Sequence, residues 1–131
     1  DAFEADYPSR DGFGLQAMGD IAQAYRHAGN VEKFLDSMRR FRNSLDQQSA
    51  QGADNFLMAL AEAYYALLAG DPDTALTQLE RAHRLGFNLD VDLAPAFREL
   101  DGLPRFEALQ AASVERVNAE RAKLGWEPVS P

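Results

Sequence analysis

A chain of 131 residues, 46% of them hydrophobic, is long enough for one domain with a substantial core. Its formal net charge of −8 at pH 7 argues against binding to nucleic acid or to an anionic membrane surface, because both attract a basic face. The absence of cysteine excludes disulfides, thiolate chemistry and metals held by sulfur.

The start of the chain shows no targeting segment. No apolar run approaches the roughly 20 residues of a membrane span, and no signal peptide is visible. The first residue is Asp1 rather than Met, so we expect a processed protein or a piece of a longer one. We expect it to be soluble, with the cytoplasm favoured over the periplasm. Residues 1–13 carry Pro8 and Gly12 without a sustained period, and we interpret them as a lead-in segment.

From Gly14 onward, apolar residues recur at the spacing of one helix face. Those of the first helix are Leu15, Met18, Ile21, Ala22 and Tyr25. Gly29 is a natural helix stop, and Asn30 is a good N-cap for a second helix that begins at Val31. The apolar residues of that helix are Phe34, Leu35, Met38 and Phe41. We expect the two helices to form a hairpin over residues 14–46.

Residues 47–54 are small and polar, which predicts a loop with Asp54 as the next N-cap. A third helix is predicted over residues 55–69. Its wide apolar face consists of Phe56, Leu57, Leu60, Ala61, Tyr64, Leu67 and Leu68. Its narrower opposite stripe consists of Met58, Glu62, Tyr65 and Ala69. A helix this apolar should be covered on most sides and should therefore lie in the middle of the fold.

A fourth helix follows directly. Gly70 ends the third helix, Asp71 is the next N-cap, and Pro72 occupies the first turn, where a missing N–H costs nothing. This helix is predicted to extend to Leu85, which gives a second hairpin over residues 54–86.

The last part of the chain, residues 92–125, is predicted to form a short helix and a longer one. The short helix begins at about Leu93 with Asp92 as its cap, and the longer one begins at Pro104. Residues 126–131 form a tail. No window alternates with period two for long enough to be a strand, so the predicted class is all-α.

Two sets of residues resemble the tetratricopeptide repeat (TPR) family. The first helix of a TPR repeat carries a bulky residue, a large–small doublet, an aromatic residue and a turn glycine. The second helix of the repeat carries two alanines around a bulky residue. The first set is Met18, Ile21, Ala22, Tyr25 and Gly29, and the second is Gly70, Ala75, Leu79 and Ala82. Small residues at Ala75 and Ala82 would let two helix backbones approach closely.

The resemblance implies a right-handed α-α superhelix of about three antiparallel helical hairpins. Residues 98–125 also look like the closing segment of bacterial TPR proteins, so the last helix is expected to be a terminal cap. Phe34 and Phe41 stand where the family has two alanines, which predicts that the first hairpin is either splayed wider or packed on something large. A homodimer that buries this side is one hypothesis.

Catalytic chemistry has little support in the sequence. His27 and His83 lack metal-ligand spacing, no GxSxG or phosphate-binding loop is present, and the Asp71–Asp73 turn is interpreted as helix capping. We expect no catalytic residue, no cofactor and no metal, and so no enzyme. The basic group of Arg39, Arg40 and Arg42 is interpreted as a solvated outer helix face, with contact to an acidic neighbouring domain as the alternative.

The resemblance also implies where a ligand binds. TPR proteins bind extended peptides or helices in a concave groove lined by the first helix of each pair. In the first pair the implied positions are Gln16, Gly19, Gln23, Arg26 and His27. In the second pair one register directs Leu57, Leu60, Tyr64 and Leu67 to the groove, and the other directs Met58, Glu62, Tyr65 and Ala69 there. We favour the second register because it leaves the apolar face for the core.

The candidate peptide-binding residues are therefore Gln16, Gln23, Arg26, His27, Met58, Glu62 and Tyr65. The first functional hypothesis is a non-enzymatic module that binds a protein or peptide partner, and neither nucleic acid nor a membrane. The alternative is a regulatory or self-association segment of a larger bacterial signalling protein or transcription regulator.

Overall fold

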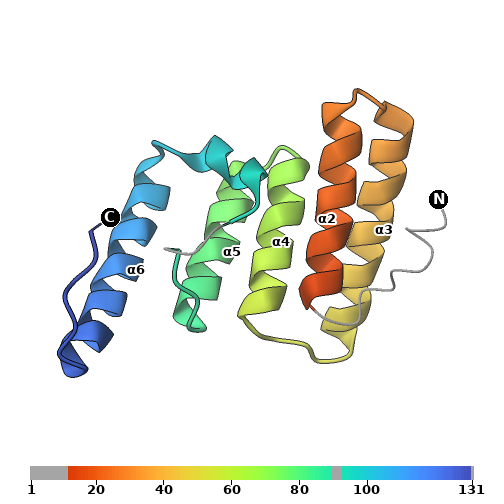
Figure 1. Cartoon of the computed structure of the whole chain (residues 1–131). Helices are drawn as coiled ribbons and strands as arrows, with labels where there is room; N and C mark the ends of the chain where they lie inside the picture. Colours follow the sequence, from red (N-terminus) through yellow and green to blue (C-terminus); the bar gives the residue numbers. More distant parts are fainter. Residues whose placement is uncertain (1–11, 90–92, 131) are drawn as a thin grey trace.

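The computed structural model describes residues 12–89 and 93–130, and within these ranges it contains helices and no strand (Figure 1). The predicted all-α class is thereby confirmed. The elements in chain order are α2 Gly12–His27, α3 Val31–Ala50, α4 Phe56–Leu68, α5 Pro72–Arg84, the 3-10 helix η1 Pro95–Leu100 and α6 Pro104–Lys123.

The predicted helix boundaries around the two turn glycines are confirmed. The side chain of Asn30 accepts a hydrogen bond from the backbone N–H of Lys33, and that of Asp71 accepts one from the N–H of Thr74. These bonds satisfy N–H groups that have no partner within their own helix. The turn at Gly70 has a φ of +81°, a conformation that L residues rarely adopt.

The loop predicted over residues 47–54 is shorter than expected. Helix α3 continues to Ala50, and Gln48 on its last turn is buried. Asn55, not Asp54, caps α4 by accepting a hydrogen bond from the N–H of Met58. Asp54 instead forms an ion pair with Arg81 of α5. The polar composition of the segment thus reflects a solvated helix end as well as a loop.

The predicted short helix near Leu93 is the 3-10 helix η1, which begins two residues later at Pro95. Its predicted cap, Asp92, lies outside the described residues. Phe97 and Leu100 of η1 are both buried. Residues three apart lie on the same side of a 3-10 helix, so this spacing suits its three residues per turn.

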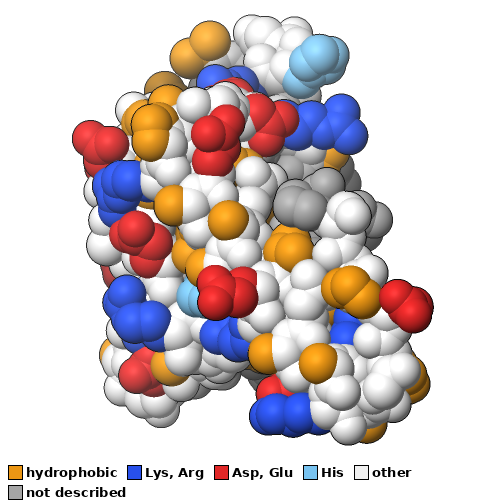
Figure 2. Space-filling view, turned by 90° about the vertical axis from the view of Figure 1, so that its left-hand side faces the viewer, with side chains coloured by type: hydrophobic (Ala, Val, Ile, Leu, Met, Phe, Trp, Pro, Cys, Tyr) orange, Lys and Arg blue, Asp and Glu red, His pale blue; other side chains and the backbone are white. Residues whose placement is uncertain are grey.

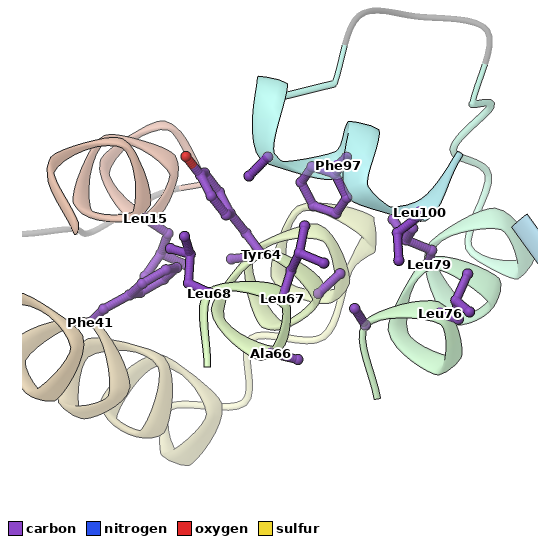
Figure 3. Close-up of a cluster of buried hydrophobic side chains, with 14 of the residues drawn as sticks. Leu15, Phe41, Tyr64, Ala66, Leu67, Leu68, Leu76, Leu79, Phe97 and Leu100 are labelled. Atoms are coloured by element: carbon purple, nitrogen blue, oxygen red, sulfur yellow. The ribbon is translucent and has the colours of Figure 1, made fainter. Parts of the chain in front are cut away.

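Helix α4 lies at the centre of the packing. It contacts α2, α3, α5 and η1, while α6 packs on α5 at the end of the row (Figure 1). Most of its residues are buried, as expected for so apolar a helix. Ala75 and Ala82 of α5 are fully buried, in keeping with the close helix contact predicted for small residues. Figure 3 shows the apolar side chains that converge on α4 from its neighbours.

Phe41 of α3 is fully buried within the chain. Its ring contacts the rings of Tyr64 and Tyr65 edge-on, at centroid distances of 6.3 and 5.6 Å. Phe41 thus packs on two large rings of α4 within the chain itself.

The described helices include none whose length and apolar character would suffice for a membrane crossing.

Candidate functional site

An apolar cavity lies beside α4, between α2 on one side and the segment around η1 on the other. Its volume is about 180 Å³ and it is partly open to solvent. The lining residues are Gln16, Phe56, Leu57, Leu60, Ala61, Tyr64, Phe87, Leu93, Ala94 and Phe97. Most of these side chains are apolar, so the cavity offers a site for an apolar group rather than for a charge.

Two aromatic rings line the cavity where α4 begins. Phe56, the first residue of α4, stacks on Phe87 with a centroid distance of 5.7 Å and an interplanar angle of 25°. Phe56 is 36% exposed, which is high for so large an apolar side chain. The pair therefore presents an aromatic surface at the cavity's edge.

Tyr64 lies between α2 and η1 (Figure 3). Its hydroxyl donates a hydrogen bond of 2.7 Å to Asp20 of α2, and its ring lies 5.6 Å from that of Phe97. The ring also fills the space beside Gly19, where an added Cβ would come within 2.7 Å of two ring carbons. These contacts join α2, α4 and η1 around one side chain.

The environment of Tyr64 favours the neutral phenol. Burial, and then the hydrogen bond to the Asp20 carboxylate, raise the pKa of Tyr64 well above its ordinary value. Because the pKa of Tyr64 is raised in the folded state, the stability contributed by its neutral phenol is fully present below about pH 10. This contribution is lost as the pH rises above about 10.

The Tyr64→Phe variant tests this assignment. We expect it to lower the free energy of unfolding at pH 7 by about 1 kcal/mol, because one hydrogen bond is lost. The difference from the wild type should shrink as the pH rises from about 9 to 11, because the wild type alone loses the contribution of the phenol. Urea unfolding across this pH range measures both quantities, and a constant difference would contradict the assignment.

The groove residues predicted on α2 are spread along its length. Gln16 lines the cavity, whereas Gly19 is buried under Tyr64. Gln23 is partly buried, and its Oε1 has no hydrogen-bond partner among the described residues. Near the C-terminal end, Arg26 forms a 3.4 Å ion pair with Glu99 of η1, and His27 is exposed. The structure therefore brings only Gln16 of this set to the cavity.

The groove residues predicted on α4 face α3 or the core. Arg42 of α3 donates two hydrogen bonds to the Glu62 carboxylate, at 2.9 and 2.7 Å, and its guanidinium lies 4.9 Å from the centre of the Tyr65 ring. Met58 is only 4% exposed. Glu62 and Tyr65 therefore face α3, and Met58 belongs to the core rather than to an open groove.

The alternative register agrees with the cavity, which is lined by Leu57, Leu60 and Tyr64. The register favoured from the sequence places the wide apolar face of α4 in the core and the stripe that contains Glu62 and Tyr65 in the groove. In the structure both faces of α4 are covered over most of their length. On the narrower stripe, Glu62 pairs with Arg42 of α3. Arg42 pairs with Glu62 and Asp46 and its side chain is 32% exposed, so it is partly covered rather than solvated as predicted. The hydrogen bond to Glu62 also raises the pKa of Arg42. Arg39 and Arg40 do lie on the outer face, where both pair with Asp36.

The segment after α5 supplies Phe87, Leu93 and Phe97 to the cavity, and none of them was predicted to belong to the site. The sequence showed only a run of apolar residues interrupted by aspartates, which was interpreted as a connection and a short helix. The residues that this run would contact lie on α2 and α4, far from it in the sequence.

A buried contact joins Ser113 of α6 to His83 of α5. Ser113 Oγ lies 3.3 Å from His83 Nδ1 and accepts a hydrogen bond of 2.9 Å from the N–H of Leu89. Ser113 is fully buried, so a substrate has no access to its oxygen. The contact ties α6 to the end of α5. Among residues 12–89 and 93–130, no group of three or more His, Asp or Glu side chains is placed to hold a metal ion.

Comparison of the chain with protein-family models, with curated proteins and with solved structures gives no match.

Proposed function

We propose that the chain is a non-enzymatic interaction module that binds a peptide or a helix of a partner protein in a groove beside α4. In this proposal the helices form a TPR-like right-handed superhelix, with α2–α3 and α4–α5 as its hairpins and α6 as its cap. The observation that carries the proposal is the open apolar cavity between α2 and the segment around η1, with α4 as its floor.

The size of the cavity suggests what it holds. A cavity of about 150 Å³ lined by apolar side chains is large enough to bind benzene. The cavity here, of about 180 Å³, therefore suits one aromatic or branched aliphatic side chain. An anchor of this kind in a desolvated pocket often supplies a large share of the binding energy of an interface.

Surface charge supports a protein partner over nucleic acid. The chain is acidic overall, and on the face seen in Figure 2 basic and acidic side chains are interspersed. That face shows no continuous basic field that would attract a phosphate backbone.

A peptide-display selection on the immobilised chain tests the proposal. We expect the wild type to enrich peptides that share one large apolar residue. An enriched peptide should bind the Leu57→Glu variant at least about tenfold more weakly, because a carboxylate would then line the apolar cavity. Leu35→Glu is the matched control, since Leu35 is 60% exposed on α3 and does not line the cavity.

Circular dichroism of both variants establishes that each remains helical. The proposal fails if no peptide is enriched, or if the enriched peptides bind the two variants equally.

The alternative, a regulatory or self-association segment of a larger protein, has one supporting observation. Val31 and Leu35, which are four residues apart on α3, are 67% and 60% exposed. Neighbouring positions on one helix face form a small apolar patch that another surface could cover. Sedimentation of the wild type and of Leu35→Glu tests this alternative, which predicts an association that the substitution removes.

A further inference from the structure

One arginine of α6 holds the segment that follows α5. Nη1 of Arg116 donates to the carbonyl oxygen of His83 at 2.6 Å, and Nη2 donates to the carbonyl oxygen of Phe87 at 2.6 Å. Nε of the same guanidinium donates to Oδ1 of Asn88 at 2.7 Å. A planar guanidinium directs its donors along fixed lines, so this side chain binds all of these acceptors at once.

The contacts around Arg116 fix a stretch of backbone. The carbonyl of His83 belongs to the last turn of α5, where helix carbonyls lack partners and a cation is favoured. Ser113, one turn earlier on α6, accepts a hydrogen bond of 2.9 Å from the N–H of Leu89. Helix α6 therefore holds the chain on both sides of Asn88.

This stretch carries one wall of the cavity. Phe87 lines the cavity, and its ring stacks on that of Phe56 at the start of α4. Helix α5 ends before Phe87, whose N–H bonds to the carbonyl of Ala82 at 3.0 Å. Its carbonyl oxygen is held by Arg116 and also lies 3.2 Å from His83 Nδ1. The position of the Phe87 ring thus depends on a contact from α6.

We propose that Arg116 is a positioning residue for the cavity. By holding the carbonyl of Phe87, it keeps the ring of that residue against Phe56 and so limits access to the cavity. It does so from α6, which supplies none of the described lining residues. This inference rests on the proposed function, because it takes the cavity as the place where a ligand binds.

The attachment of α6 and the occupancy of the cavity are then linked. A ligand that packs on Phe87 binds more tightly while Arg116 holds that residue. By reciprocity, the same ligand strengthens the attachment of α6 to the end of α5. The terminal helix thereby tunes the affinity of the cavity in addition to covering α5.

Thiol labelling tests the proposal without any ligand. The chain has no cysteine, so Ala61→Cys introduces a single thiol that lines the cavity at a position only 5% exposed. Ala59→Cys places a reference thiol at a fully buried position of α4 outside the described lining. We expect Arg116→Met to accelerate the reaction of Ala61→Cys with an aromatic disulfide at least about tenfold, because the wall opens locally. The reaction of Ala59→Cys should change less than about twofold.

Arg105→Met is the matched control. Arg105 also joins α6 to α5, and its described hydrogen bonds are to Glu80 and Thr77 rather than to residues 87–89. Its removal should leave both labelling rates within about twofold of their values in the chain with both arginines.

Arg116→Lys provides a second variant that keeps the charge. A lysine ammonium lacks the fork that reaches several acceptors, so the labelling rate of Ala61→Cys should lie between those with Arg116 and with Arg116→Met. The proposal is overturned if Arg116→Met leaves this rate unchanged, or if labelling rises equally at both thiols, since Arg116 would then stabilise only the fold as a whole. A display selection that enriches no peptide would overturn the proposed function but would not alter these rates.

Discussion

Replacing Gly19 by valine is expected to lower the free energy of unfolding by about 2–3 kcal/mol. A Cβ at this position would lie 2.7 Å from two carbons of the Tyr64 ring. That ring cannot move aside cheaply, because it is 3% exposed and is held by Asp20 and Phe97. Urea unfolding followed by circular dichroism measures the change.

Ala24→Val is the matched control for this prediction. Ala24 is on the same helix but is exposed, so the substitution should cost less than about 1 kcal/mol, which is the difference in helix propensity. In a Tyr64→Leu background the Gly19→Val substitution should cost less than in the wild type, because the ring that it meets is absent. Additive effects of the two substitutions would show that Gly19 and Tyr64 do not limit the approach of α2 and α4.

Replacing Glu62 by alanine is expected to lower the free energy of unfolding by about 2 kcal/mol. The substitution removes both hydrogen bonds to the partly buried guanidinium of Arg42 and leaves that charge between α3 and α4. Asp46→Ala is a close control, because Asp46 also pairs with Arg42 but is 65% exposed. An exposed pair typically contributes less than about 1 kcal/mol, so the two variants should differ in unfolding experiments.

The same pair of variants tests the register of α4. If Glu62 lined an open groove, Glu62→Ala would lower the free energy of unfolding no more than Asp46→Ala does. Equal effects would therefore contradict the position of Glu62 against α3 and would favour the register originally predicted.

The register shows why part of the site escaped prediction. The two stripes of α4 were both visible in the sequence, but choosing between them required knowing what covers each stripe. Arg42, which pairs with the polar stripe, was itself interpreted as solvated. Phe97, which packs on Tyr64 beside the cavity, belongs to the short helix η1, which the sequence did not connect with the site. Neither contact has a signal in the spacing of residues along one helix.

The sequence by itself determined the helical class and most helix boundaries. Asn30 and Asp71 cap their helices by accepting a hydrogen bond from the backbone N–H of the residue three positions later in the chain. Gly29 and Gly70 adopt positive φ at the preceding turns. These features depend on only a few neighbouring residues. Only the tertiary structure decided which face of α4 meets α3, which face borders the cavity, and that Arg116 of α6 holds Phe87. These outcomes depend on pairs of surfaces far apart in the chain, whose burial and hydrogen bonding exist only when both are in place.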